Sequence, residues 1–388
     1  MKIAVASSGL GHVTRGIESW AADLGAALAD RREDVTLFKG GGTKQYPYEK
    51  VVPCWRRGDE RTARILRRLP KRFSWRVGLG SGYEIEQLTF ALRLIPHLKR
   101  DRFDILHVQD PLVAITLQRA RRMGLVPTRT ILMHGTEEPA QFLRRIDHVQ
   151  QITPWHLEQA RRAGFAKPAW TAINNFIDTD LFKPGQCRDL RDELGIDQES
   201  PVILTVAAVK RQHKRIDHLL GEFSRLIGND QGPPPILVVA GGWESDTDGL
   251  IAEGTAALGD QVRFLIRFPR QRMPDLYRIA DLFVLCSLSE MSPLSLVEAG
   301  ASGLPCLVNQ NPVLEWMTGP GGIPIDMTAR GALASSIRDL LEDGIRRNSL
   351  GQLAREHCLT LFRRDRVVDS ILDFYHSVLA DGGGMPGD

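Results

Sequence analysis

Residues 201–208 read Pro-Val-Ile-Leu-Thr-Val-Ala-Ala, a run of apolar and β-branched residues that is typical of a buried parallel strand. The amphipathic stretch Ile216–Ile227 follows it and predicts a helix. The same order opens the chain, where Lys2–Ala6 precedes Gly16–Ala29. A strand-and-helix rhythm that starts twice predicts two parallel-sheet α/β units in series.

Further apolar runs extend both units, and a polar segment separates them. The segment Asn175–Gly185 is rich in turn-forming residues of the kind that join domains. Two parallel sheets in series predict a ligand-binding cleft between the domains. The further strands are expected at Asp34–Phe38, Ile105–Val108, Thr130–Met133, Pro235–Ala240, Val262–Ile266, Leu282–Cys286 and Pro305–Val308, with another helix at Leu112–Met123.

Length and composition indicate a globular protein. The chain has 388 residues, enough for two or three domains, with 43% hydrophobic and 25% charged residues. Its five cysteines lie far apart and form no CxxC motif, which argues against a disulfide framework or a zinc site. No apolar run reaches the roughly 18 residues of a membrane span, and the N-terminus turns polar too soon for a signal peptide. We expect a cytoplasmic protein.

Positive charge is concentrated in the first half of the chain. Residues 1–185 contain 30 Lys and Arg against 19 Asp and Glu, and the basic segment Trp55–Arg76 holds nine cations and two anions. One interpretation is a solvated helix face. The other is an amphipathic helix that contacts an anionic membrane at its inner face, or an acidic acceptor. Nucleic acid is not expected as a partner, because no recognised reader motif accompanies the segment.

A glycine-rich loop, Ser7–Gly16, follows the first predicted strand. Its glycines would let backbone N–H groups approach a phosphate at a helix N-terminus. A dinucleotide fingerprint needs Gly or Ala where Thr14 stands, and the second strand is followed by Lys39 and Gly40 instead of the acidic residue that holds a ribose. Nicotinamide and flavin dehydrogenases are therefore disfavoured, as are P-loop NTPases, since the chain has no GxxxxGK[ST] motif.

Two glutamates lie in the segment Leu285–Pro305. Glu290 and Glu298 are eight residues apart, about two helical turns, which predicts that both carboxylates lie on the same side of one helix. Carboxylates suit the vicinal hydroxyls of a sugar or a ribose. From the spacing alone, an exposed pair of glutamates with no shared ligand is the alternative.

Four segments in this order resemble retaining glycosyltransferases of family 4. The E-x7-E pattern followed by Ala-Gly-Ala-Ser-Gly-Leu-Pro is similar to their donor-binding signature, and Asn174–Pro184 is similar to their interdomain NGVDTDLFKP segment. Gly9–Glu18 resembles their first loop, and Val206–Asp217 their VGRLxxxKGxD stretch. The resemblance implies the GT-B fold, two Rossmann-like parallel-sheet domains facing across a cleft. We expect an acceptor-side domain over residues 1–180, a donor domain over 181–365, and a helix over 366–388 that returns to the first domain and ends in a disordered tail.

The resemblance also implies site residues. Glu298 would bind the ribose, Glu290 the transferred sugar and Lys214 the diphosphate. His134 would lie near the reacting sugar, although a core-facing histidine at a strand end is an alternative. Glu290, His134 and Lys214 are thus the implied catalytic residues; the donor-binding residues are Glu298, Lys214, Arg215, Lys210, Arg211, Gly9, Gly11, Leu294 and Ser295, and the acceptor-side residues are His12, Arg15 and Asp110.

One position departs from the family pattern. Ala208 stands where the family usually has the arginine of "GRL", so half of the cationic clamp on the diphosphate is missing. Leaving-group charge must be balanced, and Lys210, Arg211 or Arg215 is a candidate replacement.

The implied reaction is retaining transfer from a nucleotide sugar, UDP-sugar being favoured over GDP-sugar, to a hydroxyl of a glycan, a lipid-linked acceptor or a small metabolite. The departing diphosphate would help to deprotonate that hydroxyl. No metal is expected, because the patterns Asp178-Thr-Asp180 and Asp246-Thr-Asp248 do not end a recognisable metal-site strand. An inverting transferase with His12 as general base, a nucleotide-sugar epimerase and a non-catalytic sugar-nucleotide-binding protein remain alternatives.

Overall fold

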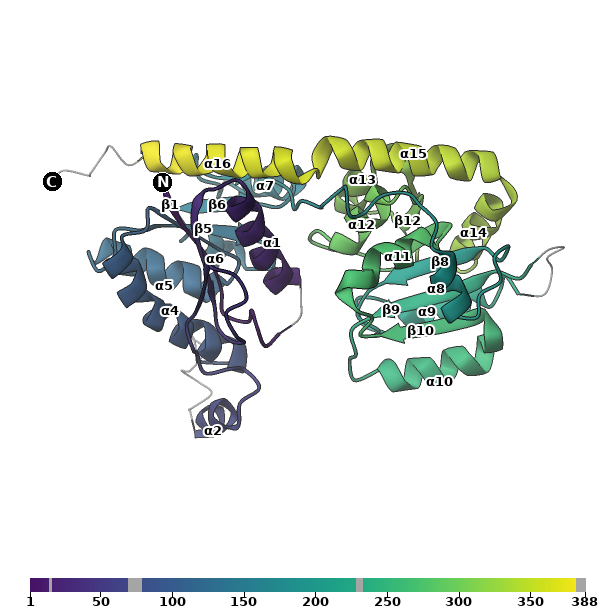
Figure 1. Cartoon of the computed structure of the whole chain (residues 1–388), viewed down its shortest axis with the longest axis horizontal. Helices are drawn as coiled ribbons and strands as arrows, with labels where there is room; N and C mark the ends of the chain where they lie inside the picture. Colours follow the sequence, from purple (N-terminus) through teal and green to yellow (C-terminus); the bar gives the residue numbers. More distant parts are fainter. Residues whose placement is uncertain (14–15, 69–78, 228–232, 382–388) are drawn as a thin grey trace. The chain divides into compact units, whose positions relative to one another are not determined.

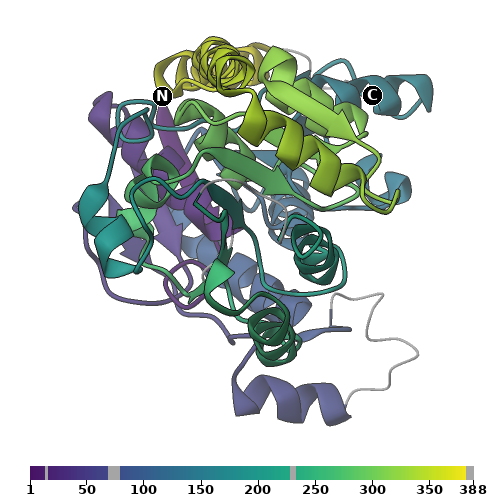
Figure 2. The same cartoon turned by 90° about the vertical axis from the view of Figure 1, so that its right-hand side faces the viewer.

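The computed structural model describes residues 1–13, 16–68, 79–227 and 233–381. The chain forms two compact units, the first made of Met1–Asn175 with the chain from Val367 onward, the second of Phe176–Arg366. Each unit contains a parallel sheet with helices on both faces (Figures 1 and 2). The predicted pair of parallel-sheet α/β units is confirmed.

The first unit contains a seven-stranded sheet in the order β3-β2-β1-β4-β5-β6-β7, and every pair of neighbouring strands is parallel. Strands in the middle of such a sheet are buried on both faces, so Ile105–Val108 is mainly apolar, whereas Glu49–Val51 and His148–Gln151 are mainly polar in sequence. The strands are β1 (Lys2–Ser7), β2 (Asp34–Lys39), β3 (Glu49–Val51), β4 (Ile105–Val108), β5 (Arg129–His134), β6 (His148–Gln151) and β7 (Thr171–Ala172).

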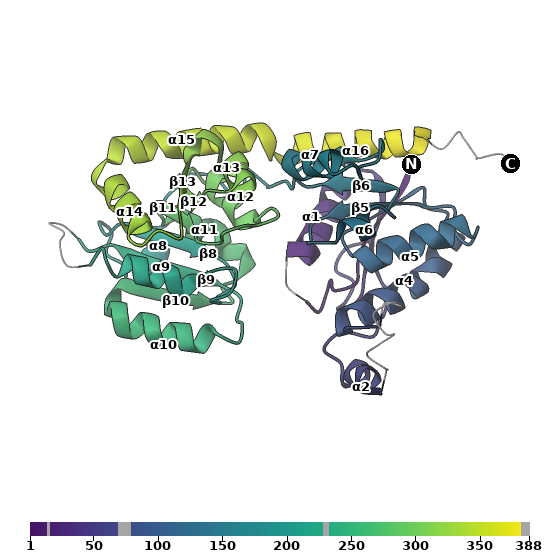
Figure 3. The same cartoon turned by 180° about the vertical axis from the view of Figure 1, so that it is seen from behind.

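Helices cover both faces of the first sheet (Figures 1 and 3). α4 and α5 pack in one apolar cluster with Ala4 and Ala6 of β1. On the other face, His107 of β4 contacts Trp20 of α1, with ring centroids 5.0 Å apart, and its Nδ1 lies 2.8 Å from the Tyr375 hydroxyl of α16. The helices are α1 (Gly16–Asp30), α2 (Glu60–Arg68), α4 (Gly82–Asp101), α5 (Pro111–Arg122), α6 (Ala140–Leu143), α7 (Pro154–Arg162) and α16 (Arg364–Ala380).

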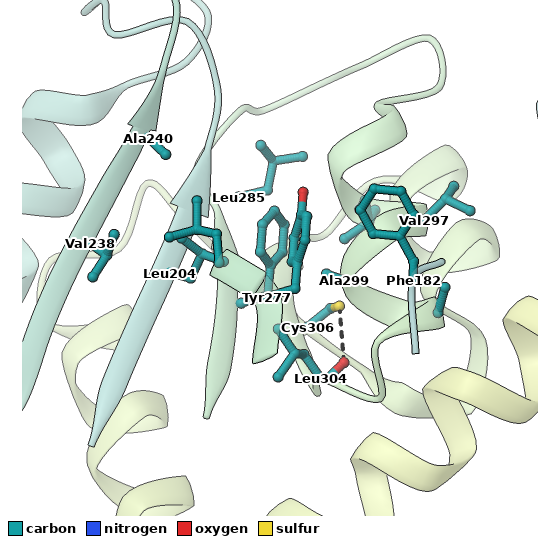
Figure 4. Packing of buried hydrophobic residues seen from close by; sticks show 14 of the residues in the cluster. Phe182, Leu204, Val238, Ala240, Tyr277, Leu285, Val297, Ala299, Leu304 and Cys306 are labelled. Carbon is teal, nitrogen blue, oxygen red and sulfur yellow. Dashed lines mark hydrogen bonds between the residues drawn. The ribbon is translucent and has the colours of Figure 1, made fainter. Parts of the chain in front are cut away.

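The second unit contains a six-stranded parallel sheet in the order β10-β9-β8-β11-β12-β13. Alternate residues of the inner strands enter two different clusters; Leu204 of β8 faces one and Ile203 the other. Figure 4 shows the cluster that contains Leu204, in which sheet side chains meet α11 and α12. The strands are β8 (Val202–Val206), β9 (Ile236–Gly241), β10 (Val262–Ile266), β11 (Leu282–Leu285), β12 (Cys306–Asn309) and β13 (Gly322–Ile325).

Helices α9, α10 and α14 cover one face of the second sheet, and α8, α11, α12, α13 and α15 contribute to the cluster on the other. The predicted helix Ile216–Ile227 is shorter in the structure, because α9 ends at Phe223 and continues as turns. The helices are α8 (Arg188–Glu193), α9 (Ile216–Phe223), α10 (Thr247–Leu258), α11 (Met273–Arg278), α12 (Leu294–Ala301), α13 (Pro312–Thr318), α14 (Ala332–Glu342) and α15 (Gly344–Leu361).

Candidate active site

The strand order of the second sheet reverses between β8 and β11. In open parallel sheets, ligands bind beyond the carboxyl ends of the strands at such a reversal, because the two connections diverge to opposite faces there and leave a crevice. The loops that follow β8 and β11 carry residues 207–215 and 286–293. Most of the predicted donor-binding residues of this unit therefore lie at the place where the topology leaves room for a ligand.

Lys214 and Glu290 meet at this reversal. Lys214 Nζ forms an ion pair with Glu290 Oε1, and the two side chains are only 17% and 9% exposed. His213 Nε2 lies 3.5 Å from Glu290 Oε2 and 3.0 Å from the carbonyl oxygen of Ser289. His213 and Arg215 both have left-handed backbones, with φ of 69° and 50°. Non-glycine residues in this conformation are strained and are typical of functional sites.

Glu298 is 6% exposed and lies inside α12, where its Oε2 accepts a hydrogen bond of 2.7 Å from the hydroxyl of Tyr277. The expectation that both glutamates lie on one helix is wrong. Pro293 is the N-cap of α12, and the residue before a proline is sterically driven out of the helical region. Glu290 therefore lies in the loop before the helix.

The candidate replacements for the missing arginine have different partners. Arg211 forms an ion pair with Glu253, and Arg215 donates to the carbonyl oxygen of Met327 at 2.8 Å. Within the described part of the chain, the Lys210 side chain has no hydrogen bond or ion pair, which leaves its ammonium group available. Leu294 and Ser295 are half-buried in the first turn of α12.

The first sheet also reverses, between β1 and β4. Asp110 follows β4 and is 1% exposed. Its carboxylate accepts hydrogen bonds from the backbone N–H and the hydroxyl of Ser8, both 2.9 Å, and from the hydroxyl of Tyr83 at 3.0 Å. Burial raises the pKa of Asp110, and these hydrogen bonds offset part of the rise. Asp110 thus fixes the first glycine loop to the end of β4.

A second buried carboxylate, Glu86 of α4, was not expected from the sequence. It is fully buried and accepts hydrogen bonds from the Arg57 N–H at 2.8 Å and from the Arg57 guanidinium at 2.6 and 3.1 Å. His12 Nε2 lies 3.0 Å from its Oε2. Burial alone would raise the pKa of Glu86, but the hydrogen bonds from Arg57 and His12 lower it below its ordinary value. The sequence contained one indication of this buried carboxylate, because Glu86 follows Ile85 on the apolar face of an amphipathic helix.

Internal packing accounts for the two glycines of the first loop. A Cβ on Gly9 would overlap the carboxylate of Glu18, and one on Gly11 would overlap the backbone of Gly41. Gly11 also has φ of +96°, a conformation that side chains disfavour. The predicted role of both glycines toward donor phosphates stays a prediction.

His134 ends β5 and is 7% exposed. Its Nδ1 lies 2.7 Å from Oε1 of Gln151, which fixes the ring, whereas its Nε2 is buried without a partner among the described residues. Burial lowers the pKa of His134 and lowers that of neighbouring His156 to about 4, which favours the neutral form of both rings.

The basic segment is described only up to Arg68, and Arg15 also lies outside the described residues. In α2 the arginine side chains are exposed, whereas Ile65 and Leu66 are half-buried. No helix in the described ranges is long and apolar enough to cross a membrane. The same residues contain no group of three or more His, Cys, Asp or Glu side chains placed to hold a metal ion.

Family models match both units. The model described as glycosyltransferase family 4 matches residues 14–181, and the model described as glycosyl transferases group 1 matches residues 187–357. The chain belongs to glycosyltransferase family 4. This family 4 member is 31% identical over 219 residues to D-inositol 3-phosphate glycosyltransferase 1 of Catenulispora acidiphila; the match covers 54% of the chain and 52%, about half, of that relative.

Another relative of this family 4 chain is N-acetyl-alpha-D-glucosaminyl L-malate synthase of Bacillus anthracis, 24% identical over 77% of the chain and 81% of the relative. Two solved structures establish the GT-B fold. Sucrose-phosphate synthase from Thermosynechococcus elongatus superposes with a TM-score of 0.78 at 19% identity, over 98% of this chain and 100% of that one. HepE of Anabaena in complex with UDP-glucose superposes with a TM-score of 0.74 at 15% identity, over 97% and 100%.

Proposed function

We propose that the protein is a retaining glycosyltransferase that transfers the sugar of a UDP-sugar to an acceptor hydroxyl without a metal ion. The observation that carries this proposal is the meeting of Lys214 and Glu290 at the reversal of the second sheet, directly before the helix that contains Glu298. Family membership supports it, as do the similar structures solved with UDP and UDP-glucose.

In this proposal each charged group has one task. Glu298 accepts hydrogen bonds from the ribose, Glu290 binds the transferred sugar, and Lys214 pairs with the diphosphate. The ion pair with Glu290 already holds the Lys214 ammonium in place, so a diphosphate that replaces the carboxylate needs little reorganisation. The bond from the sugar C1 to the diphosphate oxygen breaks, and a bond from C1 to the acceptor oxygen forms on the same face. The acceptor proton passes to the departing diphosphate oxygen.

We also infer that the acceptor is anionic. The names of the two relatives contain inositol 3-phosphate and L-malate, which are both anions. Residues 1–185 of this chain carry an excess of Lys and Arg, which favours the approach of such acceptors. The exposed arginines of α2 support a second expectation, peripheral contact with an anionic membrane surface.

The contact of His12 with Glu86 favours one other candidate, an inverting transferase. If Glu86 accepts the proton on Nε2, the Nδ1 of His12 is left as a hydrogen-bond acceptor, the form that a general base needs. The His12 side chain is 10% exposed, and its Nδ1 has no partner in the part of the chain that the structure describes.

The anomer of the product separates the two candidates. Nucleotide sugars are first screened by thermal stabilisation, because a ligand at 100 times its dissociation constant adds roughly 2.7 kcal/mol. The product formed from the best donor is then examined by proton NMR. We expect the configuration of the donor to be kept, with Glu298→Ala weakening donor binding and Glu290→Gln mainly lowering kcat. An inverted product that disappears in His12→Ala would establish the inverting reaction instead.

A further inference from the structure

Glu298 is a buried carboxylate whose position depends on a second buried side chain. A carboxylate that is 6% exposed needs hydrogen-bond donors to offset its lost hydration. Tyr277 of α11 supplies one, since its hydroxyl donates to Glu298 Oε2 at 2.7 Å. The hydroxyl also lies 3.3 Å from the carbonyl oxygen of Ser295. It has one proton, and the shorter contact with the charged group is the stronger hydrogen bond.

The ring of Tyr277 cannot easily move. It is fully buried, and it packs against Phe182 and Phe283 with ring centroids 5.7 and 6.1 Å apart. Figure 4 shows the ring inside the apolar cluster with its hydroxyl pointing away from Cys306. Burial raises the pKa of the Tyr277 hydroxyl far above its ordinary value, and the charge of Glu298 raises it further, so the hydroxyl keeps its proton.

We propose that Tyr277 is a positioning residue of the donor site, which holds the Glu298 carboxylate in the orientation that accepts hydrogen bonds from the ribose. This inference rests on the proposed function, in which Glu298 binds the ribose. A carboxylate offers about four lone-pair positions, and the hydrogen bond from Tyr277 occupies one of them. The apolar core behind the site thereby fixes the geometry of a polar contact with the ligand, as preorganised binding sites require.

The test compares two probes, UDP and 2′,3′-dideoxy-UDP, by calorimetry. Wild-type protein is expected to prefer UDP, because only UDP has the ribose hydroxyls. In Tyr277→Phe, UDP should bind about tenfold more weakly while dideoxy-UDP binds unchanged, and kcat at saturating donor should stay within twofold of wild type. A merely structural role would weaken both nucleotides equally, and that result would overturn the inference.

Tyr375→Phe is the matched control. Tyr375 is also fully buried, and its hydroxyl contacts His107 in the first unit at 2.8 Å. The variant Tyr375→Phe loses a buried hydroxyl, as Tyr277→Phe does, but outside the donor site. We therefore expect its preference for UDP over dideoxy-UDP to equal that of wild type.

A second comparison asks whether the two substitutions act through the same hydrogen bond. If Tyr277 acts through Glu298, then Tyr277→Phe combined with Glu298→Gln should bind both nucleotides as Glu298→Gln alone does. If the double variant bound either nucleotide more than threefold more weakly than Glu298→Gln alone, the inference would be overturned. If Glu298→Gln abolishes the preference but Tyr277→Phe keeps it, the positioning role is wrong and the proposed function stands. If wild-type protein binds neither nucleotide, both are wrong.

Discussion

Removing the buried carboxylate of Glu86 should destabilise the first unit by several kcal/mol. Glu86 is fully buried and accepts three hydrogen bonds from Arg57, at 2.6, 2.8 and 3.1 Å. Breaking a buried ion pair from one side costs about 3–5 kcal/mol, because the remaining charge loses its partner. Glu18 Oε1 lies 3.7 Å from the Arg57 guanidinium and still balances part of its charge in the variant. We therefore expect Glu86→Ala to lower the free energy of unfolding by about 3–4 kcal/mol.

Hydrogen exchange measured by mass spectrometry reports the stability of each unit separately. Amides of core strands exchange through opening of the whole unit, and every 1.4 kcal/mol changes the rate tenfold. In Glu86→Ala, exchange in β4 should therefore accelerate roughly 100- to 700-fold, whereas β8 of the second unit should keep its rate. Glu60→Ala removes an exposed glutamate that lies 3.8 Å from Arg64, and it should change neither strand by more than about twofold. If the exchange rate of the β4 amides changed less than threefold in Glu86→Ala, the reasoning would be refuted.

The contribution of Glu86 to the stability of the first unit should decrease at low pH. The folded-state pKa of Glu86 is lowered, so its ion pair adds stability at pH values above the unfolded pKa of about 4.3, and this stability is lost as the pH falls through the folded value. After correction for intrinsic exchange, the difference between wild type and Glu86→Ala should therefore shrink below pH 4.3. A difference that grows on acidification would contradict the assignment.

Three other outcomes are expected. Lys214→Ala should lower kcat/KM by about 100- to 1000-fold, because it leaves the departing diphosphate without its cation, and a loss below tenfold would remove Lys214 from that role. Ala208→Arg should tighten UDP binding in calorimetry by supplying a second cation; unchanged affinity would show that the clamp is already complete. Replacing Arg64, Arg67 and Arg68 by serine should abolish sedimentation with anionic vesicles at low salt, since each cation contributes about 1 kcal/mol near such a surface. Equal sedimentation of the wild type at high salt would instead exclude an electrostatic contact.

Strands such as β4 and β8 were predictable because buried parallel strands are apolar on both faces, whereas β3, β6, β7 and β13 were not predicted from the sequence. The runs Ile105–Val108 and Val262–Ile266 have these same bounds in the structure. The meeting of Lys214 with Glu290 agrees with the strand order, since the loops that carry them follow adjacent strands β8 and β11. Local periodicity gave the wrong geometry for Glu290, because it ignored the effect of Pro293 on the start of α12.

The buried cluster of the first unit could not be predicted by the same means. Arg57 and Glu86 are 29 residues apart, and their contact depends on how α4 packs against the loop before α2. Nine cations in the basic segment made Arg57 look like one more surface charge. In the structure its side chain is only 21% exposed, and its guanidinium carbon lies 4.2 Å from the centre of the Tyr83 ring.

The place of α16 in the first unit has a consequence for biosynthesis. Ile371 and Tyr375 of this helix are fully buried in that unit, although the 191 residues of Phe176–Arg366 are translated before them. At about 5–20 residues per second, the ribosome needs roughly 10–40 s to make the intervening unit. Until then, the nascent first sheet lacks the helix that covers His107, and the apolar surface around it is open to chaperones and proteases. A nonsense mutation just before the codons of α16 would consequently damage the first unit, although the sheet of that unit is already translated.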